Sequence, residues 1–294
     1  MDISPTMPFP KKHLTALGKS MAYVDEGAGD PIVFLHGNIT SSFMWRNIIP
    51  HVAPFAHCIA IDNIGQGDSD KLDNSGPDSY RLAEHQGYTN AALEALDLGD
   101  HVTIMVHDWG SQIGFTWARE HADRMKGIAS MQALVGDFHS EHWPPTVQAM
   151  FKRFRSDEGE QLVLQDNHFV EHVLPAMVIR DLTDEEMDEY RRPYRNPGED
   201  RRPTLTWPRE IPIEGEPADV LALMQENDAF LRASPLPKLF INTEPGAVLV
   251  GEHRDIVRRW PNQTEVTVAG LHYCQEDSPH EIGQALADWY RSLA

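Results

Sequence analysis

The chain is predicted to fold as an α/β protein with a mostly parallel sheet covered by helices on both faces. Short, almost wholly apolar runs alternate with longer stretches of helical periodicity, as in strands buried on both sides of a parallel sheet. Polar residues or glycines follow several of these runs directly, which is typical of strand ends. The region 135–214 interrupts the rhythm because it is rich in proline and charge and has no strand-like run.

The predicted strands are short. The first alternates loosely between apolar and polar residues, and the others are mostly apolar. In chain order they are residues 21–25, 31–35, 58–61, 102–106, 127–131, 237–241 and 265–268. The stretches between most of these runs are long enough for a helical crossover that returns the chain to a parallel strand.

Helical periodicity predicts helices on both sides of region 135–214 and within it. They are residues 80–96, 111–120, 217–233 and 277–292 outside the region, and 158–164, 168–179 and 184–190 inside it. The proline-rich sequence R-R-P-T-L-T-W-P-R-E-I-P-I closes the region. We therefore expect a sheet domain formed by residues 1–134 and 215–294, with residues 135–214 inserted as a helical cap.

Composition narrows the possible partners and location. The 294 residues carry a net charge of −20 and are 41% hydrophobic, which argues against nucleic acids and anionic membranes as partners. The first residues lack the apolar segment of a secretory signal, and no apolar run could span a bilayer. We expect a cytoplasmic protein in which Cys58 and Cys274 are buried free thiols.

The sequence V-H-D-W-G joins the predicted strand 102–106 to the predicted helix 111–120. Strand, tight turn and helix form the layout of a nucleophile elbow, and Asp108 stands at the nucleophile position. An aspartate is already ionised, and a helix N-terminus favours its charge. As a nucleophile it would form an ester intermediate. The alternative role of Asp108 is an ordinary helix N-cap.

Three further residues follow predicted strands and complete a possible site. His272 comes late in the chain, after the nucleophile, where a general base is expected. Asn38 follows the run 31–35, at the loop that supplies oxyanion-hole donors in this layout. Trp109 adds an indole N–H, which only donates. Two N–H donors beside a carboxylate suit a small anionic leaving group such as a halide. The alternatives are a structural histidine and a packing tryptophan.

The chain resembles the haloalkane dehalogenases of the α/β-hydrolase superfamily over nearly its whole length. The motifs that carry the resemblance include F-L-H-G-N-I-T-S-S-F-M-W-R-N-I, I-G-Q-G-D-S-D-K, V-H-D-W-G-S, F-V-E-H-V-L-P and G-L-H-Y-C-Q-E-D-S-P. The resemblance implies an eight-stranded sheet with an inserted cap. It also implies SN2 attack by Asp108, ester hydrolysis by water that His272 activates, and halide binding by Asn38 and Trp109, without a cofactor or metal.

The resemblance further implies the reactants and an apolar pocket under the cap. A small halogenated hydrocarbon and water would give an alcohol, a halide and a proton, in a protein that is a monomer or weak homo-oligomer. The residues implied for the pocket are Trp143, Phe151, Phe169, Val173, Trp207, Pro208, Ile211, Ala247, Val248, Leu271 and Tyr273. Ordinary packing in the cap is the alternative for each of them. Tyr273 adds a hydroxyl where close relatives carry phenylalanine.

One position departs from the family pattern. Where close relatives carry the catalytic glutamate, this chain has Gln132. A glutamine can bond to a histidine but cannot supply the negative charge that stabilises an imidazolium. Three interpretations stay open. Glu244 could stand in as the acid, with Asp137 a poorer candidate; the enzyme could work slowly with Gln132 alone; or the protein could trap its alkyl ester.

Two other activities use a similar site. An epoxide hydrolase shares the aspartate and histidine, but its usual H-G-x-P loop is replaced here by H-G-N-I, and the cap tyrosines Tyr190 and Tyr194 lie in a charged stretch that we expect to be exposed. A coelenterazine-type luciferase is a further alternative on the same scaffold. Impaired turnover with a trapped alkyl-enzyme is a different class of function, which Gln132 keeps open.

Overall fold

The computed structural model describes residues 2–293 and contains an eight-stranded sheet. The strands are β1 (Lys11–Ala16), β2 (Lys19–Gly27), β3 (Pro31–Leu35), β4 (His57–Ile61), β5 (Val102–Asp108), β6 (Met125–Ala133), β7 (Lys238–Pro245) and β8 (Gln263–Gly270). Their order is β1-β2-β4-β3-β5-β6-β7-β8. The pairs β1·β2 and β2·β4 are antiparallel, and the other pairs are parallel. The prediction of a mostly parallel sheet is confirmed.

The residue pattern does not predict β1. Its sequence K-K-H-L-T-A has few apolar residues, and most of its side chains are exposed or half-buried. The strand lies at the edge of the sheet and pairs with β2 alone. An edge strand has little apolar surface to bury and is protected by charged side chains, so the apolar signal used for the other strands is missing.

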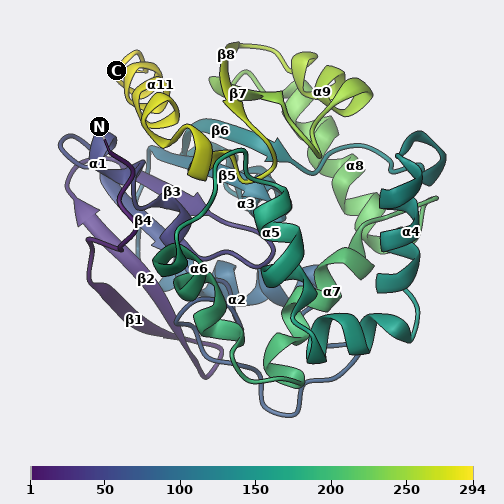
Figure 1. The fold of residues 1–294 in the computed structure, drawn as a ribbon. Coiled ribbons are helices and arrows are strands. Elements are labelled where there is room, and N and C mark those ends of the chain that lie inside the picture. The colour runs from purple at the N-terminus through teal and green to yellow at the C-terminus, as the bar shows by residue number, and fades with distance from the viewer. Residues whose placement is uncertain (1, 294) are drawn as a thin grey trace.

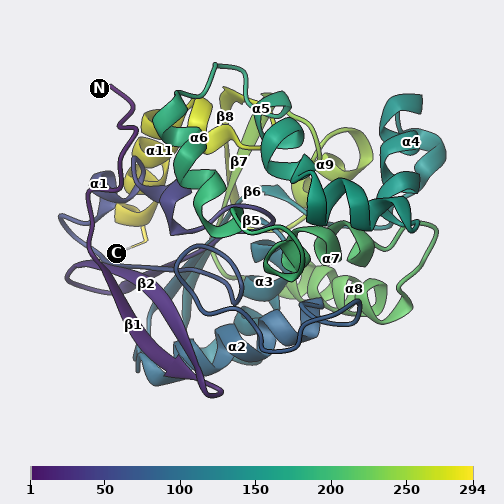
Figure 2. The same ribbon diagram turned by 60° about the horizontal axis from the view of Figure 1, so that its bottom comes forward.

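Helices cover both faces of the sheet (Figures 1 and 2). They are α1 (Ile49–Val52), α2 (Leu82–Ala95), α3 (Gly110–Glu120), α8 (Ala218–Ala233), α9 (Gly251–Arg258), α10 (Cys274–Asp277) and α11 (Pro279–Arg291), with short 3-10 turns η1 (Ser42–Trp45) and η2 (Ala122–Arg124). The side chains of strand β3 show which helices cover which face of the sheet. Its Val33 and Leu35 pack with residues of α2, α3 and α8, whereas Ile32 and Phe34 pack with residues of α1 and α11.

The segment between β6 and α8 is helical and forms the teal and green ribbons of Figure 1. Its elements are η3 (Ser140–His142), α4 (Pro145–Phe154), η4 (Glu160–Gln165), η5 (Phe169–Val173), α5 (Leu174–Ala176), α6 (Asp184–Arg191), η6 (Arg192–Tyr194), η7 (Glu199–Arg201) and α7 (Arg202–Glu210). Its apolar side chains share a cluster with Ile39 and Phe43 of the sheet domain. The segment is therefore packed onto the sheet domain; its boundaries at 135 and 214 stay a prediction.

Two features of this segment correct the sequence analysis. Helix α7 falls on the proline-rich stretch: Pro203 occupies the first turn, where no N–H is needed, and Pro208 lies inside the helix. The expectation that Tyr190 and Tyr194 are exposed is wrong, since both are buried. Adjacent charged residues such as Glu189 and Arg195 are half-buried or exposed, while the two rings, four residues apart, are buried.

Both cysteines are buried free thiols, as predicted. Burial raises the pKa of Cys58 to about 12, and the pKa of Cys274 is raised by burial as well. Neither thiol is a reactive thiolate at neutral pH. Among the helices of residues 2–293, none is both long and apolar enough to cross a membrane.

Candidate active site

Asp108 lies at the turn between β5 and α3, with a left-handed backbone (φ 50°). The turn packs tightly against the end of β3. A Cβ at Gly37 would lie 2.0 Å from Oδ1 of Asp108, and a Cβ at Gly110 would lie 2.2 Å from the carbonyl oxygen of Leu35. Glycine is required at both positions because any side chain would collide. This is the backbone geometry of the elbow that the sequence predicts.

Two groups hold the buried Asp108 carboxylate. The backbone N–H of Asn38 donates to Oδ1 at 2.8 Å, and Nε2 of His272 lies 3.1 Å from Oδ2. Burial alone would raise the pKa of Asp108, but the hydrogen bond and the electrostatic attraction to His272 outweigh it and lower the pKa below the usual value. The carboxylate is therefore ionised, as a nucleophile must be.

His272 lies between β8 and α10 and is buried. Its backbone carbonyl accepts a hydrogen bond from Nε2 of His107 at 2.8 Å, which fixes the loop. An ionised carboxylate can only accept, so Nε2 of His272 carries the proton that points at Asp108. The other ring nitrogen, Nδ1, is buried without a hydrogen-bond partner among residues 2–293.

Gln132 lies near the end of β6, and its side-chain amide forms hydrogen bonds with the end of β7 and the loop after it. Its Oε1 accepts from the backbone N–H groups of Ala247, Val248 and Leu249 at 3.4, 3.0 and 3.3 Å. Its Nε2 donates to the hydroxyl of Thr243. No hydrogen bond links Gln132 to His272 in the described chain.

The two candidate stand-in acids lie elsewhere. The Glu244 side chain is 56% exposed and pairs with Nη1 of Arg254 at 2.7 Å. Asp137 is exposed, and its backbone carbonyl accepts a hydrogen bond from His253. Within residues 2–293, no carboxylate is hydrogen-bonded to Nδ1 of His272. The structure thus does not bring Glu244 or Asp137 to the histidine.

Asn38 and Trp109 line the same cavity as Asp108 and His272. The Asn38 amide oxygen accepts from the backbone of Ile39 at 2.8 Å, and its Nδ2 makes a long contact of 3.4 Å to the carbonyl of Thr204. The indole N–H of Trp109 has no hydrogen-bond partner among the described residues. The indole N–H of Trp109 and the second N–H of the Asn38 amide are therefore available to an anion that enters the cavity.

The cavity has a volume of about 520 Å³. Nearly all residues expected to line it do so, namely Trp143, Phe151, Phe169, Val173, Pro208, Ile211, Ala247, Val248 and Tyr273. Trp207 and Leu271 do not. Trp207 packs behind the Trp109 ring instead (centroids 4.8 Å apart), and Leu271 is half-buried outside the lining. The cap tyrosines Tyr190 and Tyr194 also lie outside the lining, and their hydroxyls bond to Glu276 and Gln66.

Sequence reasoning missed several apolar lining residues. They are Leu134, Phe138, Val147, Met150, Phe154 and Met177. Three of them, Val147, Met150 and Phe154, belong to α4, which is not among the predicted helices. Their spacing of three and four residues is the signal of an amphipathic helix and could have revealed this face of the pocket.

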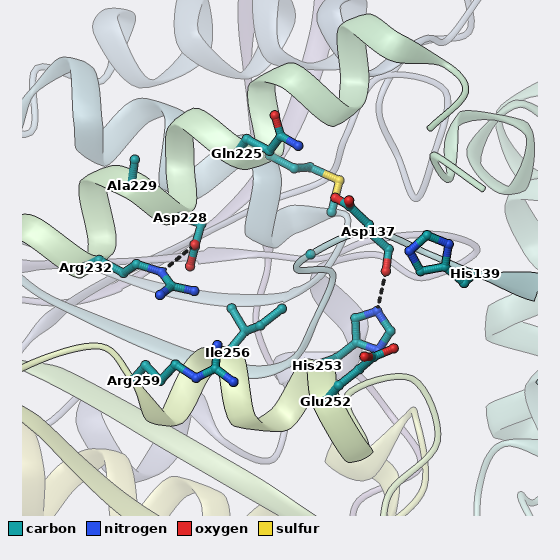
Figure 3. Close-up of a pocket in the computed structure, with 12 residues that line it drawn as sticks. Asp137, His139, Gln225, Asp228, Ala229, Arg232, Glu252, His253, Ile256 and Arg259 are labelled. Carbon is teal, nitrogen blue, oxygen red and sulfur yellow. Dashed lines mark hydrogen bonds and ion pairs between the residues drawn. The ribbon is translucent and has the colours of Figure 1, made fainter. Parts of the chain in front are cut away.

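A second hollow of about 480 Å³ lies beside the first and shares Glu252 and His253 with it (Figure 3). Its walls come from α8, α9 and the loop after β6. Charged side chains such as Asp228 and Arg232, which bond to each other, replace the aromatic walls of the first cavity. Asp108 and His272 line the first cavity and not this one.

Comparisons with known proteins identify the family of the chain. The model of the α/β hydrolase fold family matches residues 30–279. The chain is 56% identical to a haloalkane dehalogenase of Sphingobium indicum over 96% of both chains. It is 51% identical to one of Mycolicibacterium smegmatis, over 94% of this chain and 89% of that protein. The crystal structure of the haloalkane dehalogenase DbeA from Bradyrhizobium elkani superposes with a TM-score of 0.91 at 37% identity, covering 97% and 98% of the two chains.

Proposed function

The chain belongs to the haloalkane dehalogenases, hydrolases of the α/β-hydrolase fold, and from this premise we propose that it cleaves carbon–halogen bonds of small haloalkanes through an ester on Asp108. The observation that carries the proposal is the ionised Asp108 carboxylate, which lines an apolar cavity together with Asn38, Trp109 and His272. A carboxylate in such a cavity is poorly hydrated and well placed to attack carbon.

In the first step, an Asp108 oxygen attacks the carbon that bears the halogen. The new carbon–oxygen bond forms as the carbon–halogen bond breaks, and the halide leaves with the bonding electrons. The free N–H groups of Asn38 and Trp109 would stabilise the halide as its charge develops. This step needs no base, so Gln132 does not affect it.

In the second step, water attacks the ester carbonyl, releases the alcohol and restores Asp108, while His272 takes the proton of the water. For this, Nε2 of His272 must offer a lone pair and Nδ1 must hold the ring proton. Nothing in the described structure accepts a proton from Nδ1, and Gln132 adds no negative charge. We therefore propose that ester hydrolysis is the slow step of the cycle.

A second candidate is a protein that captures its substrate and does not release it. The observation in its favour is the same unpartnered Nδ1 of His272, together with the Gln132 amide bonded away from the ring. The two candidates share the first step and differ in the fate of the ester. Slow decay of the ester with alcohol release indicates an enzyme, whereas an ester that lasts as long as the folded protein indicates a capture protein.

The test is halide release from excess 1-bromobutane at pH 8 by the wild type and by Asp108→Asn. The wild type is expected to release at least about one bromide per molecule because alkylation by Asp108 is intact. Asp108→Asn should release none above the background reaction. Asp137→Asn is a matched control, since Asp137 is exposed and outside the lining of the first cavity. Equal bromide release by wild type and Asp108→Asn would refute the proposal.

A further inference from the structure

We propose that Gln66 is a positioning residue that fixes the two halide-binding groups, Asn38 and Trp109, from behind the cavity. The inference rests on the proposed function and deepens it. Gln66 follows β4 in the sequence I-G-Q-G and is fully buried, with 0% of its surface exposed. It does not line the cavity. It bonds instead to the Gly37 carbonyl, next to Asn38, and to Trp207, which packs against Trp109.

The first support is the peptide between Gly37 and Asn38. Nε2 of Gln66 donates to the Gly37 carbonyl at 3.3 Å. The N–H of the same peptide donates to Asp108 at 2.8 Å. Because a peptide is planar, holding the carbonyl also fixes the N–H and the Cα of Asn38, which carries the side-chain amide that would bind the halide. Nδ1 of His36 lies 2.9 Å from the same carbonyl, so Gln66 shares this task.

The second support is the ring of Trp207, which belongs to α7. Its indole N–H donates to Oε1 of Gln66 at 3.4 Å. The Trp207 ring stacks with Trp109, at 4.8 Å and 20°, and with His85, at 4.1 Å and 18°. A hydrogen bond from the edge of the Trp207 ring to Gln66 stops that ring from turning against Trp109. The direction of the free Trp109 N–H therefore depends on Gln66.

The two groups that Gln66 bonds to come from different parts of the chain, so Gln66 connects these parts. Gln66 belongs to the sheet domain, whereas Trp207 lies on α7 of the inserted segment. Nε2 of Gln66 also donates to the hydroxyl of Tyr194 in η6 at 3.2 Å. Gln66 thus links the inserted segment to the Asn38 loop by hydrogen bonds. Packing of the segment against the sheet domain therefore also sets the orientation of Asn38 and Trp109.

The test is the affinity for bromide of Gln66→Leu and Trp207→Phe, measured by quenching of tryptophan fluorescence. Trp207→Phe keeps a stacked ring and removes the N–H that reaches Gln66, so it tests the link even where Gln66→Leu folds poorly. We expect each variant to raise the bromide Kd about three- to tenfold, the effect of one lost hydrogen bond. The double variant should be no worse than the poorer single variant, since both changes break one link.

The matched control is Asn227→Leu. Asn227 is a fully buried amide that donates to Gln112 and Thr116, away from the cavity. It should lower the melting temperature and leave the bromide Kd unchanged. If Gln66→Leu and Trp207→Phe bind bromide within about twofold of the wild type, or if Asn227→Leu weakens binding equally, the inference is wrong. If bromide does not quench the fluorescence of the wild type, the proposal that Asn38 and Trp109 bind halide is wrong as well.

Discussion

Nε2 of His272 lies 3.1 Å from the carboxylate of Asp108, while Nδ1 on the far side of the same ring is buried without a partner. The two steps of the proposed reaction make different demands on this arrangement. Alkylation needs an ionised Asp108, which the site provides. Ester hydrolysis needs a histidine with a proton held on Nδ1, and no group of the described chain holds it there.

Restoring the acid should restore turnover. In Gln132→Glu, one carboxylate oxygen can take the three backbone N–H bonds that Oε1 now accepts, and Thr243 can turn its hydroxyl to donate to the other. The added charge would stabilise a protonated His272, so the rate of ester hydrolysis should rise by up to about 10⁴. Steady-state bromide release from 1-bromobutane measures the change. An unchanged rate would mean that Gln132 does not limit hydrolysis.

Removing the charge of Glu244 should have little effect on that rate. The side chain is 56% exposed and pairs with Arg254, so Glu244→Gln should keep turnover within about twofold, the scale of exposed ion pairs. The same bromide assay measures it. If Glu244→Gln abolished turnover, Glu244 would be the stand-in acid through a rearranged loop.

The buried ion cluster under the inserted segment should dominate the stability of this interface. Arg46 is fully buried and bonds to Glu276 and Glu186, and Arg180 completes the cluster. Arg46→Met leaves buried carboxylates with fewer partners, which costs about 3–5 kcal/mol of unfolding free energy. Urea unfolding measures the loss. Lys12→Met, which removes an exposed partner of Asp25, is the control and should leave the urea midpoint nearly unchanged.

Buried neutral histidines should make the protein less stable in mild acid. Burial lowers the pKa of His36 to about 4 and the pKa values of His85 and His107 to about 3, from an ordinary value of 6.5. Below pH 6.5 the unfolded chain binds protons that the folded chain does not, so the unfolding free energy rises with pH between about 4 and 6.5 and levels off above. Urea unfolding between pH 5 and pH 7.5 measures the slope. His85→Phe removes one such histidine and should reduce the slope by the equivalent of about one proton. An unaltered slope would contradict the conclusion that His85 is neutral in the folded protein.

The sequence predicts the chemical site better than its surroundings. Asp108 ends strand β5, and Asn38 and His272 follow strands β3 and β8. Parallel strands bring their carboxyl ends to one edge of the sheet. Their meeting in one cavity therefore follows from the order of runs and turns. The order does not reveal side-chain direction, which is why Trp207 was expected in the pocket but packs behind Trp109.

The inserted segment is less predictable for a physical reason. Its helices are short, two of its turns are π-helical, and α7 contains two prolines. Local propensity is weak there, and packing against Ile39 and Phe43 determines the conformation. The three donors to Oε1 of Gln132 could not be predicted from the sequence either, because they are backbone N–H groups of a loop 115 to 117 residues away.

Intact-protein mass spectrometry after mixing the wild type with excess 1-bromobutane tests the central claim most directly. The account predicts a protein heavier by one butyl group, with the added mass on Asp108, together with a burst of about one bromide per molecule and a slower release afterwards. Gln132→Glu under the same conditions should show little adduct and sustained release. Many bromides per wild-type molecule with no adduct at any time would contradict the claim that Gln132 makes ester hydrolysis the slow step.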